Sequence, residues 1–178
     1  MKRFFDFLLA LIGTLFIFIP SLIIALLIKI TSKGPILFWS KRIGENNKIF
    51  FMPKFRTMKE NTPDVATHLL KDPERFLTLI GPFLRRSSLD EIPQLYSVLL
   101  GAMSLVGPRP DVPGYADKLK GNDRRILELR PGITGPATLK YANEEELLAN
   151  AEDPIKYNDE VIFPDKVKLN LEYYEKQS

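Results

Sequence analysis

The chain of 178 residues is long enough for one modest domain together with a membrane anchor. Its net charge of +3, with no long block of lysine and arginine, argues against nucleic-acid binding and fits a face toward anionic lipid or a phosphorylated substrate. Because the chain has no cysteine, disulfides, thiolate catalysis and cysteine metal sites are excluded. The single histidine, His68, lies in a polar stretch and is interpreted as a surface residue.

The first long segment, Phe4 to Ile28, is almost entirely apolar and is long enough to cross about 30 Å of hydrocarbon as a helix. Pro20 interrupts it, which removes a backbone hydrogen bond and bends a helix, while the hydroxyl of Ser21 can satisfy a freed carbonyl. Both flanks are basic, so the positive-inside rule favours neither end. The basic residues are Lys2, Arg3, Lys29, Lys33, Lys41 and Arg42. A spanning helix and a re-entrant helix that returns at Pro20 and Ser21 both remain open.

The rest of the chain reads as one small mixed domain with more helix than strand. Short strands are predicted at 36–39 and 48–55, around the turn-forming residues 44–47, and a short buried segment at 104–106. Residues 60–67 are predicted to form a loop. Helices are predicted at 76–86, 91–100, 122–129, 144–151 and 165–175 from apolar periodicity and stop signals such as Gly101.

Two adjacent carboxylates, Asp90 and Glu91, stand before the helix predicted at 91–100. Ser88 and Glu91 match the S-x-x-E capping box, which is a purely structural interpretation. Pro93 argues against it, because a helix capped by Ser88 would need the backbone N–H that proline lacks. A start at Asp90 places Pro93 in the first turn and the carboxylates at a helix mouth that favours phosphate. Taken alone, the pair is more typical of a helix start than of a catalytic site.

Six basic residues could bind phosphate. They are Lys54, Arg56, Arg85, Arg86, Arg109 and Arg130. Lys54 and Arg56 alternate along a predicted strand and therefore share a face, whereas Arg109 and Arg130 occupy proline-stiffened turns. Each is alone typical of a solvated face or a turn, but together on an anchored chain they indicate phosphate chemistry at a membrane.

Five segments in this order resemble the bacterial sugar transferases, in the small monotopic form that acts as a polyprenyl-phosphate phosphoglycosyl transferase. The segments are Lys33-Gly34-Pro35, Lys54-Phe55-Arg56-Thr57-Met58, the run from Arg86 to Leu95, the run from Met103 to Pro110, and Arg130-Pro131-Gly132-Ile133-Thr134-Gly135. The resemblance covers the chain from the anchor to about Ala137.

The resemblance implies an α+β, mostly helical fold on the cytoplasmic face of the bacterial inner membrane. Residues 1–31 would form a re-entrant helix-break-helix, and residues 32–178 one small cytosolic catalytic domain with a few short strands. The implied reaction moves a sugar 1-phosphate from a UDP-sugar to undecaprenyl phosphate and releases UMP. It would initiate a capsule, exopolysaccharide, O-antigen or glycoprotein glycan, and downstream glycosyltransferases would be partners.

Residue roles follow from the same resemblance. Asp90 would be the nucleophile that forms a covalent phosphosugar intermediate, and Glu91 would assist it. Both carboxylates would hold Mg²⁺, which favours oxygen ligands and neutralises diphosphate charge. The six basic residues named above would bind phosphate groups.

The chain also departs from the family pattern. Members usually carry Ser-Pro at the helix break, where this chain has Pro20-Ser21, and many carry an aspartate at the position of Asn170. The family continues into another amphipathic helix, which leaves open a truncation at Ser178. The polar stretch 141–165 is expected to help select the sugar, with an acetylated or amino-deoxy UDP-sugar favoured. The alternatives are a catalytically silent membrane adaptor and a nucleotide-sugar binding module of the same fold.

Overall fold

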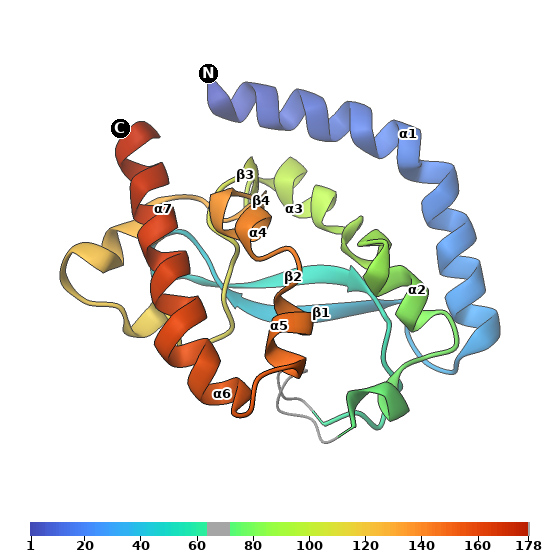
Figure 1. Ribbon diagram of the computed structural model, residues 1–178. Coiled ribbons are helices and arrows are strands. Elements are labelled where there is room, and N and C mark those ends of the chain that lie inside the picture. Colours follow the sequence, from blue (N-terminus) through green and yellow to red (C-terminus); the bar gives the residue numbers. More distant parts are fainter. Residues whose placement is uncertain (64–71, 178) are drawn as a thin grey trace. The chain divides into compact units, whose positions relative to one another are not determined.

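The computed structural model describes residues 1–63 and 72–177 (Figure 1). The predicted fold class is confirmed in its main features, with one long apolar helix and a mostly helical domain that has few, short strands. The chain forms two compact units, one made of Met1–Ser40 and Phe51–Gly101, the other of Lys41–Phe50 and Ala102–Ser178. His68 and the predicted loop beyond residue 63 lie outside the described residues.

The apolar segment forms one continuous helix, α1 (Lys2–Thr31), long and apolar enough to cross a membrane. Pro20 lies inside α1, and Figure 1 shows that the helix bends along its course. A proline cannot donate to the carbonyl four residues earlier, which here belongs to Phe16. The hydroxyl of Ser21 donates to the neighbouring Ile17 carbonyl over 2.7 Å. The helix therefore lacks one backbone hydrogen bond at Pro20 and bends, but its helical backbone continues to Thr31.

The side chains of α1 divide into a large exposed set and a small buried one. Most of its leucine, isoleucine and phenylalanine side chains are exposed, with Phe16 at 81%. An exposed apolar surface of this size is typical of a membrane or protein interaction site. Near the C-terminal end, Ile24 and Ile28 are instead buried against Phe55 and Leu84. This end of α1 is therefore part of the hydrophobic core of the first unit.

The two strands predicted around residues 44–47 are confirmed. Strands β1 (Leu37–Ile43) and β2 (Ile49–Phe55) form a two-stranded sheet joined by a 3-10 turn at Glu45–Asn47. Strand β1 ends four residues later than predicted, because Ser40 to Ile43 continue the extended backbone. Asn46 and Asn47 adopt positive φ angles of 55° and 60°, which asparagine tolerates better than most residues.

The first unit continues with short helical segments. A 3-10 turn (Pro73–Phe76) is followed by α2 (Gly81–Arg86), a second 3-10 turn (Leu89–Glu91) and α3 (Gln94–Leu100). The helix predicted from residue 76 begins only at Gly81, so its first part was wrong. The reason is that Thr78 N–H donates to the Thr57 carbonyl (2.9 Å) instead of making a helical hydrogen bond. Helix α3 ends as predicted at Gly101, whose φ of 90° suits glycine.

In the second unit, β3 (Ser104–Val106) and β4 (Gly132–Thr134) pair in parallel, with Ser104 opposite Gly132. This pairing brings two of the sequence motifs together, because Gly107 N–H donates to the Thr134 carbonyl and Gly132 N–H to the Pro108 carbonyl. The backbones approach so closely that a Cβ on Gly132 would lie 2.6 Å from the Gly107 carbonyl oxygen. Glycine is required at this contact.

The remaining elements of the second unit are helical. They are the 3-10 turns Ala116–Lys118 and Gly121–Glu128, helices α4 (Pro136–Lys140), α5 (Glu144–Ala149) and α6 (Pro154–Tyr157), a π-helical turn (Asn158–Ile162), and α7 (Phe163–Gln177). Their core contains Ile126, Leu127 and Val167, together with Ile43 and Ala116. The helices predicted at 144–151 and 165–175 are confirmed, and the one at 122–129 is a 3-10 helix.

Gly132→Ala is expected to destabilise the protein by about 3 kcal/mol or more, because the new methyl group would overlap backbone atoms that cannot move aside. Gly121→Ala is the matched control, since its Cβ would meet nothing within 4 Å and only the φ of 57° is unfavourable. The control should cost about 1–2 kcal/mol. Thermal unfolding of both variants in detergent checks the order, and equal melting temperatures would contradict it.

Candidate active site around Asp90

The predicted carboxylate pair lies in a tight turn between α2 and α3. Ser88 adopts a left-handed φ of 56°, its side chain makes no capping bond, and its carbonyl accepts from Glu91 N–H over 3.2 Å. The capping-box interpretation was therefore wrong, and so was a helix starting at Asp90. Pro93 explains both, because it cannot donate a helical hydrogen bond, so α3 begins after it at Gln94.

Asp90 is buried in this turn, with 8% of its surface exposed. Burial raises the pKa of its carboxyl above the ordinary value of 3.8, because loss of water disfavours the charged form. The positive charge of Lys54 opposes this rise, the negative charge of Glu91 adds to it, and Arg85 opposes it again. The structure thus brings four of the predicted site residues into one electrostatic cluster.

Glu91 and Lys54 form an ion pair within this cluster. Lys54 Nζ donates to Glu91 Oε1 over 2.8 Å, and both side chains are less than one-fifth exposed. Strand β2 places Lys54, and the 3-10 turn places Glu91. The alternative interpretation, in which Lys54 lies on a solvated strand face, was therefore wrong for this residue. A pair withdrawn from water is screened less by salt than a surface pair.

The three other arginine and lysine candidates of the first unit have different surroundings. Arg85, at the end of α2, donates from Nε to Thr57 Oγ1 over 3.1 Å, and Arg86 beside it is exposed. Arg56 is buried and donates to the carbonyls of Ser32 and Lys33 and to the Ser32 hydroxyl. Arg56 therefore secures the segment that follows α1.

Gln94 is a polar residue to which the sequence analysis gave no role. It is 1% exposed, and its Nε2 atom has no hydrogen-bond partner among the described residues. An unsatisfied buried donor is costly and calls for an explanation. Asp90, Gln94 and Ser97 are all buried and follow one another at spacings of four and three residues. The signal in the sequence was a polar pair inside an apolar helical pattern.

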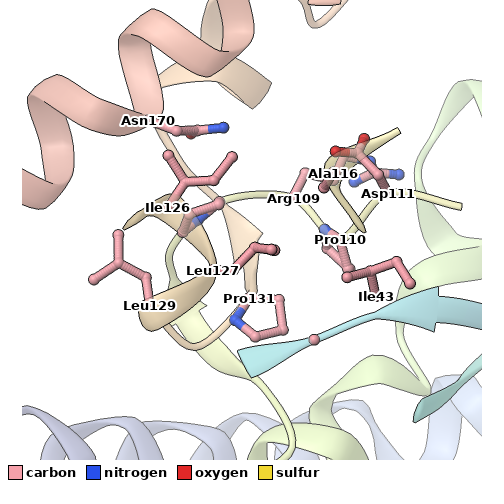
Figure 2. A pocket seen from close by; sticks show the side chains of 12 residues that line it. Ile43, Arg109, Pro110, Asp111, Ala116, Ile126, Leu127, Leu129, Pro131 and Asn170 are labelled. Atoms are coloured by element: carbon pink, nitrogen blue, oxygen red, sulfur yellow. The ribbon is translucent and has the colours of Figure 1, made fainter. Parts of the chain in front are cut away.

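The two arginines of the second unit lie in separate surroundings. Arg130 donates from Nε to Glu45 Oε2 over 3.4 Å. Arg109 lines a cavity of about 20 Å³, room for one water molecule. Figure 2 shows Asn170 of α7 on one side of this cavity and Arg109 with Asp111 on the other.

Asp111 and Asn170 give this cavity its polar character. Burial raises the pKa of Asp111 to about 6, although the positive charges of Lys166 and Arg42 oppose the rise. The Oδ1 atom of Asn170 is buried and has no hydrogen-bond partner among the described residues. Sequence reasoning missed Asp111, for which the only signal was an acid directly after the Gly-Pro-Arg-Pro turn.

The predicted metal ligands are two adjacent carboxylates. Among the described residues, no group of three or more histidine, aspartate or glutamate side chains could hold a metal ion. Mg²⁺ usually keeps several waters and is bound through one or two carboxylates together with substrate phosphates. Asp90 and Glu91 therefore fit a magnesium ion that binds with a phosphorylated substrate, and do not form a cage of protein ligands alone.

Several known proteins are similar in sequence to this chain over most of its length. The chain is 37% identical over 172 residues to the UDP-glucose:undecaprenyl-phosphate glucose-1-phosphate transferase of Escherichia coli (strain K12), a match covering 91% of this chain and 36% of that protein. It is 36% identical over 146 residues to the UDP-N-acetylgalactosamine-undecaprenyl-phosphate N-acetylgalactosaminephosphotransferase of Aeromonas hydrophila, covering 79% of this chain and 34% of that protein. These matches span about a third of the length of either relative.

A relative more similar in length is the exopolysaccharide production protein PSS of Rhizobium leguminosarum bv. phaseoli. It is 40% identical over 149 residues, which cover 79% of this chain and 74% of that protein. The sequence model of the family described as "Bacterial sugar transferase" matches residues 1–178. The chain that carries the buried Asp90 cluster therefore belongs to the bacterial sugar transferases.

Proposed function

We propose that this chain transfers a sugar 1-phosphate from a UDP-sugar to undecaprenyl phosphate and releases UMP, initiating a membrane-bound glycan. The observation that carries the proposal is the buried Asp90 carboxylate, held in a tight turn between the charges of Lys54 and Arg85. Support comes from relatives named for this reaction with glucose and N-acetylgalactosamine donors.

In the proposed first step, a carboxylate oxygen of Asp90 attacks the phosphorus atom bonded to the sugar. The bond from that phosphorus to the bridging oxygen breaks, and UMP leaves with that oxygen. In the second step, a phosphate oxygen of undecaprenyl phosphate attacks the same phosphorus and restores the Asp90 carboxylate. The product is a sugar linked to the lipid through a diphosphate. Dividing the transfer into two displacements is the usual advantage of a covalent nucleophile.

The charges around Asp90 suit this chemistry. Phosphoryl transfer depends mainly on positioning and on neutralising negative charge. The positive charges of Lys54 and Arg85, which act on Asp90, support this role for the site. Glu91, held by Lys54, would orient the substrate or handle a proton. Mg²⁺, bound by Asp90 and Glu91, would neutralise the diphosphate. Arg86, Arg109 and Arg130 are proposed to bind phosphate groups. Arg56 is proposed to contribute mainly by holding the segment that follows α1.

We also propose that α1 is re-entrant, so that the catalytic domain and both ends of the helix lie on the cytoplasmic face of the inner membrane. The bend in α1, the proline inside it and the basic residues at both flanks support this topology. A polyprenyl phosphate substrate would present its phosphate at the same face. The two rival functions, a silent adaptor and a nucleotide-sugar binding module, predict no UMP release.

The sugar can be identified by a UMP-release screen of the full chain in nanodiscs with Mg²⁺, undecaprenyl phosphate and a panel of UDP-sugars. We expect release with at least one donor, most readily an acetylated or amino-deoxy sugar, and only when the lipid phosphate permits turnover. Binding of UDP-sugars without UMP release would favour the binding module. Neither binding nor release would favour the adaptor.

Asp90→Asn should abolish both the radiolabelled phosphosugar adduct and turnover, lowering the rate by at least about 1000-fold, because an amide is not a nucleophile at phosphorus. Adduct formation is followed by gel electrophoresis with a UDP-sugar labelled in the phosphate next to the sugar. Asp123→Asn is the matched control, since Asp123 is exposed, and it should retain full activity. Wild-type turnover in Asp90→Asn would rule out the covalent route.

The activity should fall on the acid side as Asp90 takes up a proton. Because its pKa is raised, this loss should occur above pH 3.8, the ordinary value of the carboxyl. Lys54→Met should move the acid limb of kcat/KM to higher pH, since the strongest opposing charge is removed. The exposed Lys41→Met serves as control and should leave the limb in place. An unmoved limb in Lys54→Met would show that the titrating group is not Asp90.

A further inference from the structure

The side-chain amide of Gln94 is a buried hydrogen-bond donor without an acceptor. Gln94 is 1% exposed, and its Nε2 atom finds no hydrogen-bond partner in the part of the chain that the structure describes. Such a donor costs free energy, because it has lost its hydrogen bonds to water and gained none in return. Buried polar groups of this kind are uncommon, and a catalytic role is one reason for which they persist.

A right-handed turn of backbone connects Asp90 to Gln94. Asp90 lies in the 3-10 turn Leu89–Glu91. The next two residues, Ile92 (φ −47°, ψ −43°) and Pro93 (φ −60°, ψ −15°), keep right-handed helical angles up to the start of α3. On a helical backbone, side chains four residues apart are neighbours, with Cβ atoms about 6 Å apart. The spacing therefore brings the Asp90 carboxyl within reach of the Gln94 amide.

The Gln94 side chain lies deeper in the protein than that of Asp90. Both are buried, and both are therefore directed toward the interior, but 8% of Asp90 remains exposed and only 1% of Gln94. A sugar nucleotide that arrives from solvent can meet the Asp90 carboxyl, whereas the amide behind it is closed to so large a ligand. Gln94 could therefore influence the reaction only through Asp90.

We propose that Gln94 is a positioning residue whose Nε2 amide donates a hydrogen bond to one oxygen of the Asp90 carboxyl, so that the other oxygen faces the phosphorus atom. The proposal rests on the proposed function of Asp90 as nucleophile. In the covalent intermediate, one Asp90 oxygen is bonded to phosphorus and the other is a carbonyl oxygen. A neutral amide N–H can donate to a carboxylate and to this carbonyl alike, so no proton has to move.

The unpaired amide of the free protein gives this hydrogen bond its effect on rate. The donor is unsatisfied before the substrate binds and becomes satisfied as the Asp90 carboxyl turns toward phosphorus. An interaction that is stronger in the transition state than in the ground state raises kcat, whereas one that is equal in both lowers only KM. Loss of the Gln94 amide should therefore lower kcat and leave the KM for the UDP-sugar nearly unchanged.

The variant Gln94→Met tests the proposal, because methionine keeps an unbranched side chain of similar length and lacks the amide donor. Its melting temperature in detergent should equal or exceed that of the wild type, since an unpaired buried donor is removed. Ser97→Ala is the matched control. It removes a buried hydroxyl from the same helix (3% exposed) at about 10 Å along the axis from Asp90 and should keep wild-type kcat.

The full chain is assayed in nanodiscs with Mg²⁺ and the UDP-sugar that gives the fastest UMP release in the panel described above. Turnover is measured with undecaprenyl phosphate, and adduct formation in a single turnover without it. We expect Gln94→Met to lower both kcat and the rate of adduct formation by about 10- to 100-fold. The KM for the UDP-sugar should change by less than about twofold.

Wild-type rates in Gln94→Met would overturn the proposal. An equal loss in Ser97→Ala, or a lower melting temperature of Gln94→Met with a raised KM, would also overturn it, because the loss would then come from packing. If the wild-type chain forms no adduct with any donor of the panel, the covalent function itself is refuted, and the role of Gln94 with it.

The new hydrogen bond can also be observed directly, because Gln94 and Gln177 are the two glutamines of the chain. Selective ¹⁵N labelling of glutamine therefore gives two side-chain amide signals in an NMR spectrum, and the exposed Gln177 at the end of α7 is the internal reference. Adduct formation should move the amide proton of Gln94 downfield and leave Gln177 in place, and Asp90→Asn should show no shift. A Gln94 signal that stays in place while the adduct forms would contradict the proposal.

Discussion

The packing of the apolar helix α1 against the rest of the first unit is the interaction on which the Asp90 site depends. Ile24 and Ile28 form a buried cluster with Phe55 and Leu84, and Leu89 and Ile92 pack against that same cluster. Leu89 and Ile92 are the residues immediately before and after the Asp90–Glu91 pair. The apolar helix α1 therefore supports the turn that carries Asp90, so this helix and the candidate site share one hydrophobic core.

Within that support, the buried carboxylate of Asp90 is subject to opposing electrostatic influences. Burial and Glu91 favour the protonated form of Asp90, whereas Lys54 and Arg85 favour the ionised form. In the proposed reaction, a carboxylate withdrawn from water would be less solvated and therefore better able to attack phosphorus. The 3-10 turn imposed by Pro93 fixes this carboxylate on rigid backbone.

Local signals in the sequence predicted some elements well. The turn that contains asparagine and glycine correctly predicted the two strands on either side of it, and Gly101 correctly predicted the end of α3. Both signals are local, because residues that tolerate a left-handed backbone occupy the turn itself. The pairing of β3 with β4 was not predicted, since three-residue strands show no alternation and the partner is far along the chain. Similarly, the spacing of Lys54 and Arg56 predicted that both share one face of a strand. It could not predict the hydrogen bonds of Arg56, because their acceptors are residues that follow the end of α1.

The two halves of α1 hold the first unit by different means, and this difference matters for how the site responds to its surroundings. The C-terminal half contributes apolar side chains to a core, which holds wherever those groups avoid water. The N-terminal half is fixed by directed hydrogen bonds from Arg3 to α3 and by small residues in close contact. Because α3 follows directly on the turn that carries Asp90, α1 contacts the chain on both sides of this carboxylate. If Asp90 is the nucleophile, as proposed, the position of α1 bears directly on the geometry of the reaction.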